Sequence, residues 1–146
     1  MIDKNDKLLL RSIIMEHFTN PENKGLIENE KNIYVKYQDS PTCADAIDVQ
    51  LTYENNQVKN AKFEGVGCAI STAAIDILCN QIINKSKEEA LNILSNYHNM
   101  IVGQNYNEDI LDELIIFYQI YQQGNRINCA LLGADGLKNI LESEVK

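Results

Sequence analysis

The sequence predicts an α+β protein, a small three-stranded antiparallel sheet with helices packed on one face. Two observations carry this prediction. Apolar and polar residues alternate with period two in three short segments between residues 33 and 64, and from residue 68 the apolar spacing becomes that of a helix. We find no internal repeat or low-complexity tract, so the chain (1–146) is expected to form a single domain.

The first element is an expected helix from about Asp6 to Phe18, with Asp6 as its N-cap. One face of this helix carries its apolar side chains and a histidine: Leu10, Ile13, Ile14 and His17. Asn20-Pro21 should end it, because proline cannot continue a helix. Three strands are expected next, at Ile33–Tyr37, Ile47–Glu54 and Val58–Glu64. Asn55-Asn56 suits a tight turn between the last two, since asparagine tolerates positive φ.

Four helices are expected after the sheet. The first begins near Cys68 and continues through an apolar stripe that includes Cys79 and Ile82. A capping box at Ser86 opens the second, which continues to Ile101. A third is expected over Glu108–Tyr121, and the last is expected to start near Cys129.

Composition excludes two broad classes of function. A formal net charge of −8 argues against neutralising a nucleic-acid backbone, which requires clustered Lys and Arg. No apolar run approaches the roughly 20 residues that span a bilayer. The polar first residues do not resemble a signal peptide. We therefore expect a cytoplasmic protein that binds neither nucleic acid nor membrane.

Four cysteines stand at positions 43, 68, 79 and 129. Disulfides are rare in a reducing compartment, and this spacing contains no Cys-x-x-Cys pair. Cys79 lies within an apolar helical stripe, where a buried, structural cysteine is expected. We therefore exclude it from the candidate site.

Cys68 and Cys129 each stand where a loop is expected to end and a helix to begin. Gly65 and Gly67 permit a sharp turn before Cys68, and Arg126 precedes Cys129 by one turn. The free N–H groups of a helix N-terminus and a nearby guanidinium favour a thiolate, the form of cysteine that binds metals. For each cysteine alone, a small residue at a crowded helix start is the alternative interpretation.

Cys43 lies in a polar turn with Asp45 two residues later. Side chains at positions i and i+2 of a turn can reach one cation, although an aspartate in a turn commonly only caps it. Taken together, Cys43, Asp45, Cys68 and Cys129 are expected to converge. Three thiolates and a carboxylate would complete a tetrahedral zinc site or a thiolate-rich iron–sulfur site.

A nucleophilic enzyme that pairs a cysteine with a histidine is the competing interpretation. The two histidines are His17, on the apolar face of the first helix, and His98, in a helix without a motif around it. Neither has the Asn or Asp context of a catalytic triad. His17 is expected to be a buried histidine with its hydrogen bonds satisfied.

The chain also resembles the U-type iron–sulfur cluster assembly proteins, the IscU/NifU/SufU family, over nearly its whole length. Four blocks carry the resemblance: His17-Phe18-x-Asn20-Pro21-x-Asn23-x-Gly25, Pro41-Thr42-Cys43-x-Asp45, Phe63-Glu64-Gly65-x-Gly67-Cys68-x-Ile70-Ser71 and Arg126-Ile127-x-Cys129-Ala130. Two features resemble the SufU-like branch, an insertion between Cys68 and Cys129 and Asn128 in place of the histidine of IscU-like members.

The resemblance implies an IscU-like fold and a zinc ion held by Cys43, Asp45, Cys68 and Cys129. It also implies that a cysteine desulfurase passes persulfide sulfur to the protein, with Cys43 as the favoured acceptor. The alternative is a scaffold that holds iron or a transient [2Fe–2S] or [4Fe–4S] cluster and passes it to recipient apoproteins. One departure lies in the site itself, where Ala44 replaces the glycine that follows the first cysteine in the family.

Overall fold

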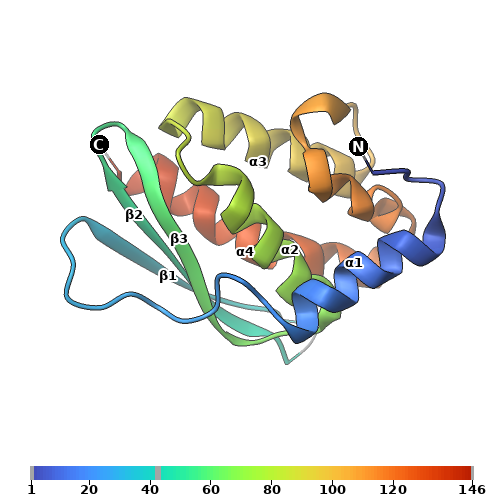
Figure 1. Cartoon of the computed structure of the whole chain (residues 1–146), viewed down its shortest axis with the longest axis horizontal. Helices are drawn as coiled ribbons and strands as arrows, with labels where there is room; N and C mark the ends of the chain where they lie inside the picture. The colour runs from blue at the N-terminus through green and yellow to red at the C-terminus, as the bar shows by residue number, and fades with distance from the viewer. Residues whose placement is uncertain (1, 42–43, 146) are drawn as a thin grey trace.

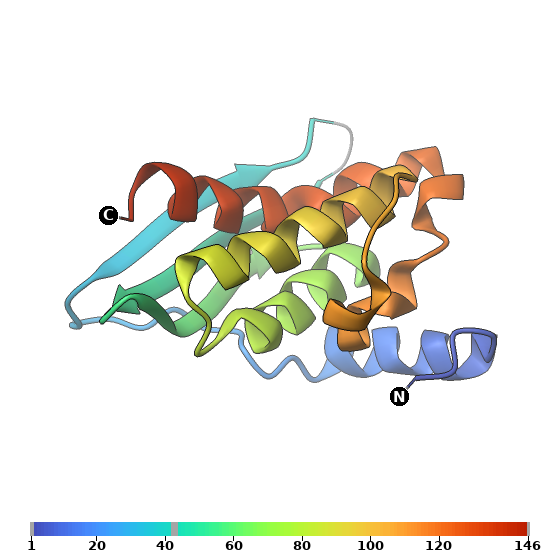
Figure 2. The same ribbon diagram turned by 90° about the horizontal axis from the view of Figure 1, so that it is seen from above.

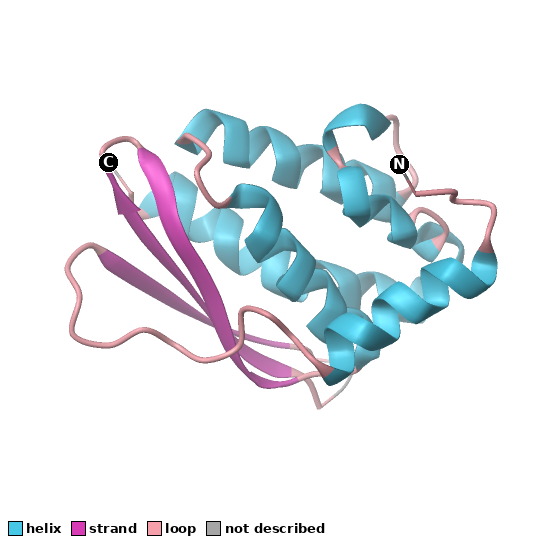
Figure 3. Ribbon diagram, in the orientation of Figure 1, coloured by secondary structure: helices cyan, strands magenta, loops and turns pink. Residues whose placement is uncertain are grey.

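The computed structural model describes residues 2–41 and 44–145. The sheet forms one side of the molecule and the helices the other (Figure 3). The elements follow in the order α1 (Lys7–Thr19), β1 (Ile33–Asp39), β2 (Ala46–Glu54), β3 (Gln57–Val66), α2 (Ala69–Ile82), α3 (Lys87–Val102), the 3₁₀ turns η1 (Glu108–Ile110), η2 (Asp112–Phe117) and η3 (Ile120–Gln122), and α4 (Gly124–Ser143). This confirms the predicted α+β class.

The three strands pair antiparallel in the order β1-β2-β3. Alternate residues of β2 point to opposite faces, and Ile47, Val49 and Leu51 are fully buried on the helical side. Asn55 and Asn56 form the β2–β3 turn with φ of 54° and 61°, as the sequence predicted.

The helices cover one face of the sheet in two layers (Figures 1 and 2). α2 packs on β3 and α4 packs on β1 and β2, while α1 lies against α2 and α3 against α4. Close approach of α4 depends on its small residues, because a Cβ at Gly136 would lie 2.7 Å from Val49 Cγ2. The buried apolar side chains of both layers form one continuous core. Among the described residues, no helix has the length and apolarity that crossing a membrane requires.

The caps agree with the predicted helix starts. Asp6 accepts a hydrogen bond from the Leu9 amide at the start of α1, and Ser86 and Glu89 form the predicted capping box of α3. After α1 the chain runs beside β3, where Gly25 donates its N–H to the Phe63 carbonyl at 2.7 Å. This contact covers part of an edge that would otherwise expose unpaired backbone groups.

The prediction of one helix over Glu108–Tyr121 is wrong. The segment forms three short 3₁₀ turns, and Asp112, the first residue of η2, has φ +48°, which an α-helix cannot contain. The four consecutive apolar residues from Leu114 to Phe117 are all buried. A run buried on every side gains nothing from helical amphipathicity, so tertiary packing decides its conformation.

The predicted start of the last helix is also wrong. α4 begins at Gly124, so that Cys129 lies in its second turn. Gly124 and Asn125 have low helix propensity. In the first turn of a helix, however, the N–H groups have no intrahelical partner, and residues of low propensity are tolerated there.

Candidate metal centre

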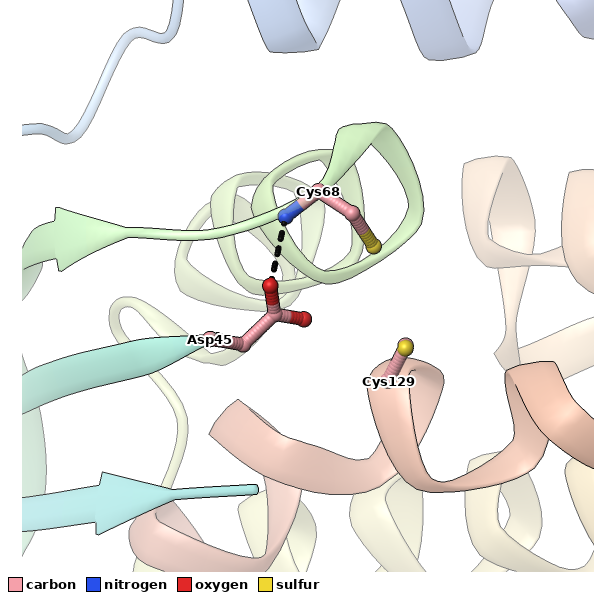
Figure 4. Close-up of side chains that lie close together, drawn as sticks. All are labelled: Asp45, Cys68 and Cys129. Atoms are coloured by element: carbon pink, nitrogen blue, oxygen red, sulfur yellow. Dashed lines mark hydrogen bonds between the residues drawn. The ribbon is translucent and has the colours of Figure 1, made fainter. Parts of the chain in front are cut away.

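The structure brings Asp45, Cys68 and Cys129 together (Figure 4). One ligand atom from each lies within 4.8 Å of the others. Sheet pairing explains part of this convergence, because Ala46 at the start of β2 pairs with Val66 at the end of β3. Asp45 and Cys68 flank this pair, and α4, packed across β2, supplies Cys129.

Asp45 is the polar centre of the group and is 6% exposed. Its Oδ1 accepts a hydrogen bond from the Cys68 backbone N–H at 3.0 Å. Its Oδ2 is buried and has no hydrogen-bond partner in the part of the chain that the structure describes. A buried carboxylate oxygen without a donor is costly, so this atom fits contact with a cation.

Cys68 is the N-cap of α2, as predicted. Its Sγ accepts the Ser71 backbone N–H at 3.5 Å, and the Ser71 hydroxyl lies 3.6 Å from the same sulfur. The sulfur thus takes the place of the oxygen of a serine or aspartate cap. It lies at the positive end of the helix dipole, where negative charge is stabilised.

Cys129 reaches the group from the side of α4 rather than from its N-terminus, and it is buried. Figure 4 shows its sulfur on the side of α4 that faces Asp45 and Cys68. The turn of α4 next to Cys129 is held by α3, because the Tyr97 hydroxyl of α3 donates a hydrogen bond to the Ala130 carbonyl at 2.7 Å. The predicted role of the helix dipole at Cys129 is therefore wrong, whereas its predicted proximity to Cys68 and Asp45 is found.

Two glycines allow the close approach of β3 and the α2 cap. Gly65 has φ +127°, and a Cβ there would lie 2.2 Å from the Ala46 carbonyl oxygen. A Cβ at Gly67 would lie 2.4 Å from Ser71 Oγ. Larger residues at either position would push apart the segments that carry Asp45 and Cys68.

The two other cysteines have different outcomes. Cys43 lies outside the described residues, and its ligand role stays a prediction. Cys79 is fully buried in the core, as predicted. Burial raises the pKa of the Cys79 thiol far above its ordinary value, with a smaller contribution from the charge of Asp76. It is therefore a packed, protonated thiol rather than a ligand.

A second polar cluster, at His17, was not predicted as a cluster. His17 is buried as expected, and its Nδ1 and Nε2 lie 2.6 Å from Asp76 Oδ2 and 2.5 Å from Glu113 Oε1. Asp76 is fully buried and also accepts the Asn23 backbone N–H at 2.8 Å. The available signal was an aspartate inside the apolar stripe of α2, which required a buried donor nearby.

The family described as the NifU-like N terminal domain matches residues 10–141, which is nearly the whole chain. The chain belongs to this family. Two relatives that are named for different functions are each similar to this chain over most of both lengths.

Among curated relatives, a protein of Bacillus subtilis (strain 168) named zinc-dependent sulfurtransferase SufU is 32% identical over 137 residues, which cover 93% of this chain and 91% of that one. The iron–sulfur cluster assembly scaffold protein IscU of Streptococcus pyogenes serotype M1 is 27% identical over 135 residues, covering 92% and 83%.

A solved structure from Fervidobacterium islandicum AW-1 superimposes with a TM-score of 0.83 at 32% identity, covering 89% of this chain and 94% of that one. That protein is described as a putative iron–sulfur cluster assembly scaffold protein for the SUF system. Membership of the NifU-like family and this shared fold confirm the resemblance drawn from the four sequence blocks.

Proposed function

We propose that this NifU-like protein acts in iron–sulfur cluster assembly as a zinc-bearing sulfur-transfer protein that accepts persulfide sulfur from a cysteine desulfurase. The observation that carries the proposal is the buried Oδ2 of Asp45, which has no hydrogen-bond donor among the described residues and lies beside the sulfurs of Cys68 and Cys129. The relative named as a zinc-dependent sulfurtransferase supports it, because the similarity extends across 93% of this chain.

Asp45, Cys68 and Cys129 would hold the zinc ion, and Cys43 would complete a four-ligand shell. Three sulfurs and one oxygen suit zinc, which accepts both donors in tetrahedral geometry. Bound zinc would keep cysteine ligands in the thiolate form at neutral pH. A purely structural zinc site is disfavoured, since such sites use four Cys or His ligands rather than a carboxylate.

The transfer step is a thiol–disulfide type exchange. The Cys43 thiolate attacks the outer sulfur of the desulfurase persulfide, so that a new S–S bond forms on Cys43. The S–S bond of the enzyme breaks, and its cysteine leaves as a thiolate. Electrons balance without an external oxidant or reductant. This chain contributes the acceptor sulfur of Cys43. The hydrogen bond from the Cys68 backbone N–H to Asp45 Oδ1 holds these two residues next to each other.

A scaffold that carries a transient cluster is the second candidate. The similarity to a protein named as an assembly scaffold favours it, as does the mixed donor set, in which one oxygen ligand would exchange more readily than a fourth thiolate. In this role, iron and sulfide are the cargo, and recipient apoproteins take the assembled cluster.

One anaerobic experiment separates the two candidates. The zinc-loaded protein is incubated with a purified cysteine desulfurase, cysteine and ferrous iron, while zinc release and visible absorption are recorded together. Zinc that stays while Cys43 gains one sulfur supports transfer. Zinc release with growth of a stable cluster spectrum on this chain supports the scaffold, and absence of both results refutes the proposal.

We further propose that residues 1–146 act as one domain in the cytoplasm.

A Cys43→Ala variant should lose sulfur acceptance. Full acceptance in that variant would move the acceptor role to Cys68 or Cys129.

A further inference from the structure

A cleft with a positively charged rim lies beside the candidate metal centre. It has a volume of about 360 Å³ and runs between α1 on one side and η2, η3 and the start of α4 on the other. Ile70, in the first turn of α2, lies two residues after Cys68 and forms part of its lining. Any occupant of the cleft would therefore contact an element that positions a candidate ligand.

The cleft is apolar at its base. Leu10 of α1, Ile70 of α2 and Ile116 of η2 are between 5% and 8% exposed, and they meet there from three different elements. The η2 wall is fixed in place, because Glu113 in the same turn contacts the His17 ring of α1 at 2.5 Å. The cleft is thus built by packed elements rather than by a loop.

The rim carries three cations. Lys7 and Arg11 are one turn apart on α1, and Arg126 lies in the first turn of α4. All three side chains are exposed, and none forms an ion pair with another described residue. No Asp or Glu is among the described residues that line the cleft. On a chain of net charge −8, such a site is a local reversal of sign.

We propose that this cleft binds an acidic segment of the cysteine desulfurase, with carboxylates against Lys7, Arg11 and Arg126 and an apolar side chain on the base. The inference rests on the proposed function, since it names the surface through which the sulfur donor docks. Cations on two facing walls require several carboxylates, which a peptide supplies along its length. Opposite charges at an interface mainly increase the association rate and fix orientation.

The test measures affinity between the zinc-loaded protein and a purified cysteine desulfurase by calorimetry at low and high salt. The double charge reversal Arg11→Glu with Arg126→Glu should weaken binding by about tenfold or more at low salt. The matched control Lys31→Glu with Lys138→Glu makes the same change in net charge at exposed positions outside the cleft, and should bind within about twofold of the parent. The milder pair Arg11→Gln with Arg126→Gln removes the same two charges without reversing them, so it tests the charges in case the double reversal misfolds. The zinc content of each variant shows whether the metal site is intact.

A cross-linking measurement identifies the occupant. A benzophenone amino acid in place of Gln119, on the cleft wall, should capture a desulfurase peptide rich in Asp and Glu. Two outcomes would overturn the inference even if the parent accepts sulfur. One is capture of a neutral or basic peptide, and the other is equal affinity of the charge-reversed and control variants for the desulfurase. Loss of sulfur acceptance without a change in affinity would instead indicate a site for a small anion, and would also overturn it. A parent protein that neither binds the desulfurase nor accepts sulfur refutes the proposed function itself.

Discussion

The carboxylate of Asp45 divides its two oxygens between two tasks. Oδ1 accepts the Cys68 backbone N–H at 3.0 Å, whereas Oδ2 is buried and has no partner among the described residues. The first contact stabilises the start of α2. The unpaired Oδ2 leaves the negative charge of the carboxylate in a buried position, where an unpaired polar group opposes folding. The sign of the contribution of Asp45 to stability should therefore depend on whether a cation is bound.

Asp45→Asn is expected to change stability in opposite directions with and without zinc. In the metal-free protein, the amide keeps an oxygen for Cys68 and removes the buried charge, so the free energy of unfolding should rise by about 1 kcal/mol. With zinc, the variant should be less stable than the parent, because a neutral amide is a poorer ligand. Denaturant unfolding of both proteins, with chelator and with zinc, measures the two differences. A lower stability of the metal-free variant would show that Oδ2 already has a favourable partner.

Gly65→Ala is expected to reduce stability by about 2 to 4 kcal/mol. The substitution combines a positive φ of +127° with a Cβ that would lie 2.2 Å from the Ala46 carbonyl, and backbone atoms cannot yield as a flexible side chain would. Zinc binding should weaken as well, because Ala46 follows Asp45 directly. Thermal unfolding and a competitive zinc titration measure the two effects.

Gly124→Ala is the matched control for this substitution. It has no atom within 4 Å of the added Cβ and lies at the start of α4, so it should leave zinc affinity unchanged and stability equal or higher by up to about 1 kcal/mol. Equal losses in the two variants would assign the effect to something other than the contact with Ala46.

Local sequence signals predicted most of the fold. The alternation at Ile47, Val49 and Leu51 identified the central strand because one of its faces is buried, and Asp6 and Ser86 identified helix starts because their side chains pair with free amides. The segment at 108–121 was not predictable in this way. Its conformation depends on packing against α1 and α2, and its apolar run has no exposed face to give a period.

The candidate site shows the same division. The junction at Cys68 was visible because two glycines and a change of period mark it locally. The proximity of Cys129 was expected only from the cysteines taken together, because no local signal encodes how α4 crosses the sheet. The contact between Asp76 and His17 joins residues 59 positions apart, and only the tertiary structure reveals it.

Cys79→Ala is expected to leave zinc stoichiometry unchanged and to cost about 1 kcal/mol of stability through lost packing. The reason is that Cys79 is fully buried in the core and its pKa is strongly raised, so that it stays a protonated thiol. Cys129→Ala, a substitution of the same size at another buried cysteine, should instead lose most of the bound zinc. Elemental analysis of the two purified variants makes the comparison. Zinc loss in the Cys79 variant would overturn the assignment of the ligands.

His17 links three elements through charge. Burial by itself would lower the pKa of His17, but the hydrogen bond to Asp76 and the charge and hydrogen bond of Glu113 outweigh it, so the pKa is raised above its ordinary value of 6.5. Ionised carboxylates only accept hydrogen bonds, so a ring that donates to both of them carries a proton on each nitrogen, which is the form that a raised pKa favours. Asp76 also receives the amide of Asn23, whereas Glu113 is partly exposed.

A group whose pKa is raised by folding stabilises the protein fully below its unfolded pKa, and this contribution is lost as pH rises through the folded pKa. The stability of the parent should therefore fall as pH increases from about 6.5 through the raised pKa of His17. His17→Gln should remove this component of the pH dependence and cost about 3 kcal/mol at pH 6, because Asp76 loses its buried cation. Denaturant unfolding from pH 6 to 9 measures the difference in the free energy of unfolding between the two proteins, which cancels titrations common to both.

Glu113→Gln is the control: it removes only the partly exposed partner of His17 and should reduce the pH dependence of stability without abolishing it. Identical pH profiles of the parent and the His17 variant would mean that the ring is neutral in the folded protein.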